Sequence, residues 1–343
     1  MTDLSAPLSA SEISAEPPEA AGREQTARWQ DFLALMKPRV MSLVVFTALT
    51  GLVCAGGKIN PIIAAVAVFC IAVGAGASGA LNMWYDADID AQMRRTRGRP
   101  VPAGRVQPAD ALTLGVVMSL FSVMLMGMAT NWLAAGLLAF TILFYALIYT
   151  MWLKRSTPQN IVIGGLAGAL PPVIGWAAVS GTTPLNAWLL CAIIFMWTPP
   201  HFWALSLYTS EDYAKAGVPM MPVAKGAKST RLQILVYSLL LVPVCLMPTV
   251  TGLGGPAYLA VSGLGGAVFL LLAVRLFLSR AGDAADPRMD AGLYDVRAAA
   301  KDARNLFAFS ILYLFLMFAA LLAEHMFGIK PFTALSFLQG FNR

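Results

Sequence analysis

The chain has 343 residues, of which 58% are hydrophobic and 12% carry charge, against about 25% charged residues in an ordinary soluble domain. Its apolar residues fall in runs of about 20, which is the length a helix needs to cross a hydrocarbon core. This composition excludes an ordinary soluble protein. The net charge of +6 fits the cytoplasmic loops of a membrane protein better than a nucleic-acid partner, and we expect none of the latter.

Residues 1–28 are rich in Ser, Ala, Pro and Glu and contain no apolar run, which predicts a disordered cytosolic tail. They are too acidic for a mitochondrial transit peptide, so a bacterial inner membrane is the expected location. Residues 29–330 are expected to form one all-helical membrane domain. Residues 331–343 would follow it as a short tail on the outer side.

The apolar runs predict nine membrane-spanning helices. They cover residues 39–57, 61–85, 109–129, 132–152, 161–180, 186–207, 232–251, 256–278 and 305–327. The segment 279–304 is rich in Asp, Arg and Ala and is expected to contain an amphipathic helix at the interface. All four cysteines lie within apolar runs, and no C-x-x-C pair occurs, so neither a disulfide framework nor a zinc site is predicted.

The basic residues predict the orientation of the bundle. With the N-terminus inside, 21 of the 24 lysines and arginines fall in inner segments. Cytoplasmic loops carry this excess. An odd number of spans then places the C-terminus outside, and the polar chemistry gathers at the cytoplasmic mouth.

A polar motif ends the second predicted span. Asn82, Asp86 and Asp90 are spaced i, i+4 and i+8, so they share one face of a helix. The two carboxylates lie about 6 Å apart along the axis. Mg²⁺ prefers one or two carboxylates together with water and phosphate oxygens, so these three residues are the predicted metal ligands. Asp88 should point to the other side.

Cations follow the carboxylates at once, in "RRTRGRP" (residues 94–100). Arginine and lysine next to a metal site are what a diphosphate leaving group requires. An alternative stays open, because Asp90 and Arg94 form an ordinary i, i+4 pair and arginines commonly flank a span. The predicted diphosphate-binding residues are Arg95, Arg99, Lys154, Arg155 and Lys215.

The stretch "NMWYDADID" (residues 82–90) resembles the N-x-x-x-D-x-x-x-D signature of the UbiA superfamily of intramembrane prenyltransferases. Within that superfamily the chain looks like the branch that farnesylates heme. The similar stretches run in order over about residues 30 to 330. They are "LMKPRV", "RRTRGRP", "YTMWLKRSTPQNIVIGGLAGALPPVIGW", "TPPHFWALSL", "DYAKAGVPMMPV" and "ARNLFAFSILYLF".

The resemblance implies nine spans around a central cavity that opens laterally to lipid. It also implies that farnesyl diphosphate alkylates a vinyl group of heme B, with water adding, and that Mg²⁺ is the metal. Heme B would thus be a substrate rather than a resident cofactor. Contact with a downstream heme A synthase or an oxidase assembly factor is a further implication. The alternatives are a prenyltransferase with another aromatic acceptor, a transporter, or a heme carrier without catalysis.

The chain departs from the superfamily at the second D-x-x-x-D motif, for which it has "SEDYAKAGVPM" (residues 210–220). Asp212 remains a candidate catalytic residue, but position 216 is not an aspartate. This departure fits the heme branch and leaves the holder of a second Mg²⁺ open. Glu211 is one alternative.

Two further residues are candidates for the chemistry. His201 follows Pro199 and Pro200, which are expected to break or kink the sixth span. It could ligate heme iron, orient the substrate, move a proton, or simply be an interior histidine. Tyr149 lies close to Lys154 in sequence, and its ring could stabilise an allylic cation. Tyrosine is also a common interfacial anchor.

Overall fold

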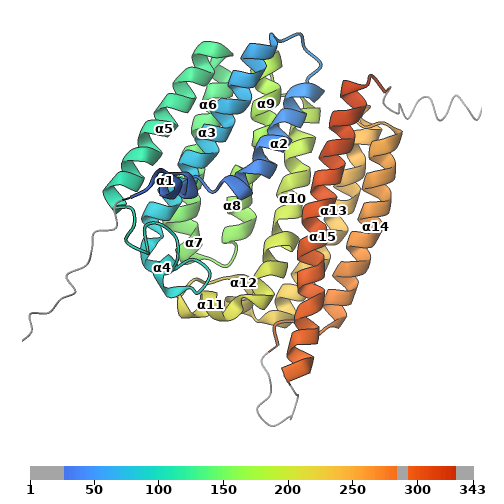
Figure 1. Cartoon of the computed structure of the whole chain (residues 1–343). Coiled ribbons are helices and arrows are strands. Elements are labelled where there is room, and N and C mark those ends of the chain that lie inside the picture. The colour runs from blue at the N-terminus through green and yellow to red at the C-terminus, as the bar shows by residue number, and fades with distance from the viewer. Residues whose placement is uncertain (1–26, 284–292, 330–343) are drawn as a thin grey trace, which may run out of the picture.

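The computed structural model describes residues 27–283 and 293–329, and the regular structure within these ranges is entirely helical (Figure 1). Eight helices are long and apolar enough to cross a membrane. The bent pair α1 (Trp29–Leu35) and α2 (Pro38–Cys54), which meet at 53°, supplies a ninth candidate. The predicted all-helical bundle of nine spans is therefore confirmed. The predicted tails, residues 1–28 and 331–343, lie almost wholly outside the described residues.

The other spans follow the predicted order. They are α3 (Pro61–Tyr85), α5 (Pro108–Ala129), α6 (Trp132–Leu143) with η1 (Phe144–Leu153) and α7 (Lys154–Ser156), α8 (Asn160–Ala169) with α9 (Pro171–Ser180), α10 (Leu185–Tyr208), α13 (Ala227–Val250), α14 (Pro256–Leu278) and α15 (Leu293–Met326). Three short helices lie together at one end of the bundle, at the bottom of Figure 1. They are α4 (Ala87–Gln92), α11 (Ser210–Lys215) and α12 (Met221–Lys225).

Local sequence explains where several spans begin and end. The side chain of Asn60 accepts a hydrogen bond from the Ile62 amide at the start of α3 (2.8 Å), and Asn131 does the same for Ala134 at the start of α6 (2.9 Å). Such caps satisfy amides that a helix leaves free. Gly181 ends α9 with a φ of 66°, a left-handed conformation that glycine adopts without strain.

The two proline pairs affect their spans differently, and the expected break of the sixth span is wrong. Pro199 and Pro200 do not break the sixth span, because α10 continues through both of them. Pro171 and Pro172 do interrupt the fifth span, since α8 ends at Ala169 and α9 begins at Pro171. Residues 284–292 of the segment 279–304 lie outside the described residues, and from Leu293 onward the chain belongs to α15, which runs to Met326. The expected interfacial helix therefore stays a prediction.

Small residues allow the elbow between α1 and α2 to lie directly on α3. A Cβ atom on Gly76 would stand 2.5 Å from the Met36 side chain, and one on Gly79 would stand 3.1 Å from the Leu35 carbonyl. Small residues at helix interfaces permit this close approach. The elbow includes Lys37, which is the one non-glycine residue with positive φ (51°) in the described part of the chain. Packing against α3 therefore fixes an unfavourable backbone conformation at Lys37.

The far end of the bundle, at the top of Figure 1, is held by a buried carboxylate. Glu324 of α15 is 1% exposed. Its two oxygens accept hydrogen bonds from the amides of Gly255 (2.6 Å) and Tyr258 (3.0 Å) at the start of α14. A carboxylate at a helix N-terminus satisfies free amides and complements the helix dipole.

Replacing Glu324 with alanine should destabilise the protein by about 3 kcal/mol, because two buried amides lose charged partners. Thermal unfolding of the purified protein in detergent measures the change. The control is Glu211→Ala, which alters an exposed glutamate and should leave the melting temperature nearly unchanged. Equal melting temperatures for the two variants would show that Glu324 does not hold α14.

Candidate active site

The polar trio, Asn82, Asp86 and Asp90, lies where α3 gives way to α4. Asp86 stands between the two helices, but the backbone bonds from Asp86 to Asn82 (2.9 Å) and from Asp90 to Asp86 (2.8 Å) keep helical spacing. The three side chains therefore share one face, as the spacing predicts. They are 4%, 0% and 0% exposed, and Asn82 Nδ2 donates to Asp86 Oδ2 at 2.6 Å.

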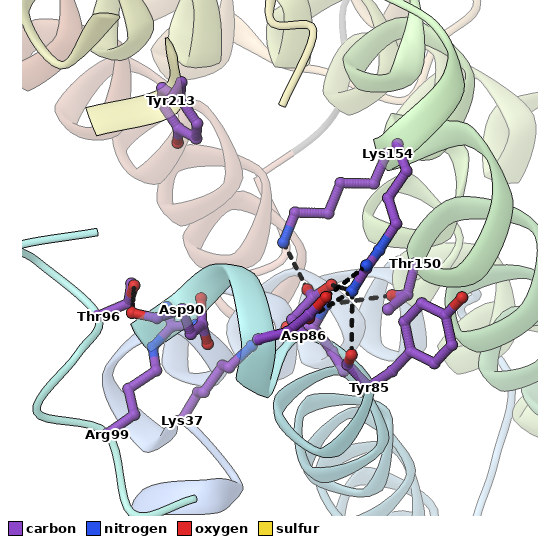
Figure 2. A network of polar contacts seen from close by, with 12 residues as sticks. Lys37, Tyr85, Asp86, Asp90, Thr96, Arg99, Thr150, Lys154 and Tyr213 are labelled. Carbon is purple, nitrogen blue, oxygen red and sulfur yellow. Dashed lines mark hydrogen bonds and ion pairs between the residues drawn. The ribbon is translucent and has the colours of Figure 1, made fainter. Parts of the chain in front are cut away.

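Each member of the polar trio faces a cation from a different part of the chain (Figure 2). Lys37 donates to Asn82 Oδ1 at 2.5 Å, and Lys154 at the start of α7 donates to Asp86 Oδ2.

Arg99 supplies the third cation. It donates to Asp90 Oδ2 at 2.5 Å. Of the predicted diphosphate-binding residues, the structure thus brings Lys154 and Arg99 directly to the carboxylates. Positive charge at this position suits a diphosphate.

The trio also has oxygens to spare for a metal ion. Asp86 Oδ1 and Asp90 Oδ1 are buried and have no hydrogen-bond partner among the described residues. A buried carboxylate oxygen without a partner is costly, and two such oxygens suit Mg²⁺. Within the described ranges no group of three His, Cys, Asp or Glu residues could hold a metal. The two carboxylates fit Mg²⁺, and Asn82 Oδ1, which accepts from Lys37 in this structure, stays a predicted third ligand.

Arg155 is held by Asp88 rather than left free for a ligand. Its guanidinium makes two 2.7 Å bonds to the Asp88 carboxylate and a 3.1 Å bond to the Tyr85 carbonyl. These bonds lower the pKa of Asp88 below the usual aspartate value. The nearest approach of Arg155 to Asp86 is 3.6 Å. Arg155 thereby joins the junction of α3 and α4 to α7, and the expected orientation of Asp88 away from the trio stays a prediction.

Arg95 reaches in another direction, toward α11. Its Nη2 donates to the Tyr213 hydroxyl at 3.1 Å, and its guanidinium carbon lies 6.0 Å from the Tyr213 ring centroid. This contact joins the loop after α4 to α11. Because Arg95 bonds to Tyr213 and not to the trio, its predicted role on the diphosphate requires the side chain to change conformation. The side chain is exposed.

The other predicted residues stand apart from the trio. Among the described contacts, none joins Asp212 or Lys215 to Asp86 or Asp90, and Lys215 is exposed. His201 bonds through Nδ1 to the Ser310 hydroxyl (2.6 Å), so its place is the interface of α10 and α15. The roles proposed for these three residues stay predictions.

Tyr149 lies against α8, where a Cβ atom on Gly164 would collide with its ring. Its ring centroid is 5.2 Å from that of Tyr145. The aromatic pair belongs to η1, the π-helix that ends at the site. Its role in stabilising a cation stays a prediction.

Sequence reasoning missed Lys37 and Thr150. The signal for Lys37 was a basic residue directly before the proline that opens a span, in "LMKPRV". Thr150 had no signal, because its position depends on the π-helix. A π-helix bonds residue i to i+5, so residues five apart lie nearly in line. The 1% exposed Thr150 thereby faces Asn82 and accepts its second N–H at 3.1 Å.

Thr150 should orient the Asn82 amide, because both Asn82 N–H groups are then engaged and Oδ1 is directed toward Lys37 and the predicted metal. Thr150→Val removes the acceptor at constant shape and should raise the Mg²⁺ concentration for half-maximal activity about tenfold. Mn²⁺ binding followed by electron paramagnetic resonance gives a second readout. Thr141→Val, whose hydroxyl bonds only within its own helix (2.8 Å to the Leu137 carbonyl), is the control. An unchanged metal affinity would exclude this role.

Comparisons with a family model and with individual relatives point to the same protein family. A family model described as the UbiA prenyltransferase family matches residues 44–295. The protoheme IX farnesyltransferase of Caulobacter vibrioides is 71% identical over 328 residues, which are 94% of this chain and 98% of the relative. The protein of the same name from Maricaulis maris is 62% identical, over 88% of this chain and 92% of the relative.

Solved structures share the fold at low sequence identity. A structure of digeranylgeranylglyceryl phosphate synthase has a TM-score of 0.67 at 16% identity and covers 86% of this chain and 98% of its own. A UbiA homologue from Archaeoglobus fulgidus bound to DMAPP and Mg²⁺ has a TM-score of 0.58 at 15% identity, with coverages of 83% and 99%.

Proposed function

The chain belongs to the UbiA prenyltransferase family, and from this premise we propose that it transfers a farnesyl group from farnesyl diphosphate to heme B. Farnesyl carbon 1 would bond to a vinyl carbon of heme B, and water would add hydroxide to the adjacent carbon. The products are heme O, diphosphate and a proton. The observation that carries the proposal is the polar trio, with buried free carboxylate oxygens beside three cations.

The site residues divide the work of releasing diphosphate. Asp86, Asp90 and Asn82 would hold Mg²⁺, which supplies positive charge to the leaving group. Lys154 and Arg99 already lie on the carboxylates, and a bound diphosphate would offer them further oxygens. Fixed positive charge at the point where negative charge develops is the main source of acceleration in such a site.

The charge distribution and the bacterial relatives support a proposed location. We propose that the polar trio opens to the cytoplasm of a bacterium, because the lysines and arginines gather on that side of the predicted topology. Farnesyl diphosphate would then enter from the cytoplasm with its chain between helices. A downstream heme A synthase or oxidase assembly factor would take the product, and co-purification with such a protein tests this step.

Reconstitution tests the function directly. Purified protein in lipid vesicles receives heme B, farnesyl diphosphate and Mg²⁺, and the extracted heme is analysed by mass spectrometry. We expect a mass gain of one farnesyl group plus water, and its loss when a chelator removes Mg²⁺. Unmodified heme from folded protein would reject heme as the acceptor. Farnesylation of another aromatic compound under the same conditions would identify the alternative acceptor.

A further inference from the structure

His201 lies at the centre of an ordered stack between α10 and α15. Its ring stacks on Trp197 (centroids 4.1 Å apart, planes at 17°) and on Phe307 (4.6 Å, 21°). Phe202 meets its edge at 5.0 Å, and Tyr208 meets Phe307 at 6.1 Å. We call these five residues the aromatic wall.

Hydrogen bonds to one residue of α15 fix the wall in place. Ser310 bonds to His201 Nδ1 at 2.6 Å through its hydroxyl, and its carbonyl accepts from Trp197 Nε1 at 2.7 Å. Both faces of the His201 ring are covered by aromatic neighbours. The histidine is therefore built to hold the stack, and the outer members of the wall are the ones free to meet a ligand.

Two outer members of the wall are accessible. The side chains of Phe202 and Tyr208 are each 37% exposed. Helix α2 touches α15 farther along, where the rings of Phe46 and Phe315 are 5.0 Å apart. Nearer the trio, Val40 at the start of α2 is 63% exposed.

Positive charge borders the wall at the end of the bundle where the polar trio lies. Arg304 is exposed and stands one turn before Phe307 on α15. Arg95 bonds to Tyr213 on α11, the short helix that follows Tyr208. The aromatic side chains of α10 and α15 are therefore followed, toward the trio end of the bundle, by arginine side chains.

One hydrogen bond connects the end of α10 to the loop beside the polar trio. Tyr213 lies on α11, which follows Tyr208, and accepts this bond from Arg95 at 3.1 Å. The same loop supplies Arg99 to Asp90. The wall therefore ends, at Tyr208, next to the short helix that bonds to the loop beside the predicted diphosphate site.

We infer that the aromatic wall binds the acceptor as a flat aromatic dicarboxylate, with its ring system against Phe202, Tyr208 and Phe307 and a carboxylate on Arg304. The inference rests on the proposed function and names the acceptor subsite. Stacked aromatic rings are attractive in offset and edge geometries. An arginine fork matches a carboxylate, and heme B carries two carboxylates on one edge of a flat ring system.

Heme binding in the absence of farnesyl diphosphate tests the subsite apart from catalysis. Wild-type protein in nanodiscs is titrated with heme B, and the absorbance change gives Kd. Arg304→Gln and Phe202→Leu should each raise Kd about tenfold, and KM for farnesyl diphosphate should stay unchanged. Heme dimethyl ester, which lacks free carboxylates, should bind wild type as weakly as heme binds Arg304→Gln.

Matched controls separate the wall from general effects. Arg275→Gln alters an exposed arginine at the end of α14, and Phe121→Leu alters an exposed phenylalanine of α5. Neither should change Kd. Farnesyl transfer with an unchanged Kd in both wall variants would overturn the subsite and leave the proposed function standing. Weakened heme binding in these variants, with no transfer by wild type, would support the subsite and reject the function.

Discussion

Replacing Asp86 with asparagine should lower farnesyl transfer by about a thousandfold. The substitution removes the charge that faces Lys154 and one of the two free carboxylate oxygens at the trio. Asparagine keeps the size of the side chain, so the loss reflects charge rather than packing. Turnover is followed by mass spectrometry of extracted heme at saturating substrates.

The control for this prediction is Asp110→Asn, which alters an exposed aspartate in the first turn of α5. It should retain full turnover. Because Lys154 loses a buried partner in the Asp86 variant, thermal unfolding must show that the variant remains folded. A folded Asp86→Asn protein that keeps more than about a tenth of wild-type turnover would remove Asp86 from the metal site.

The polar trio could be predicted because its geometry is local. Residues spaced by four share a face in any helix, and the break at Asp86 preserves that spacing. The same is true of the spans, whose lengths follow from the thickness of the hydrocarbon core. Their spacing in the sequence was therefore enough to predict that these three site residues lie together.

The partners of the trio could not be predicted, because they depend on packing between distant segments. Lys37 reaches Asn82 across 45 positions of sequence, by way of the glycine face of α3. Thr150 reaches the same residue only because η1 is a π-helix. In the sequence, Arg155 and Lys154 are equally good candidates to bind the diphosphate. In the structure, Arg155 makes its short bonds to Asp88 and Lys154 bonds to Asp86.

The continuity of α10 through Pro199 and Pro200 shows a further limit of local rules. Each proline removes one backbone hydrogen bond and favours a kink. In this chain the same turns carry Trp197 and His201, whose stacking and bonds to Ser310 tie α10 to α15. Tertiary contacts thus stabilise a helix that the sequence alone would interrupt.

Replacing Lys37 with methionine should lower kcat/KM for farnesyl diphosphate about a hundredfold. The ammonium group lies on Asn82 Oδ1, so it is placed to bind a phosphate oxygen once that amide oxygen serves the metal. Methionine keeps the length and the apolar contacts of the stem. Initial rates at varied farnesyl diphosphate give the ratio, and Lys37→Arg should restore part of it because the charge returns.

The neighbouring Arg39→Gln supplies the control, since Arg39 is an exposed cation in the first turn of α2 and should not affect the ratio. The positive φ at Lys37 (51°) is equally unfavourable for lysine, methionine and arginine, so backbone strain should not distinguish the variants. Equal kcat/KM for Lys37→Met and wild type would mean that the elbow of α1 and α2 only packs against α3. A loss shared by Lys37→Met and Arg39→Gln would assign the effect to general surface charge instead.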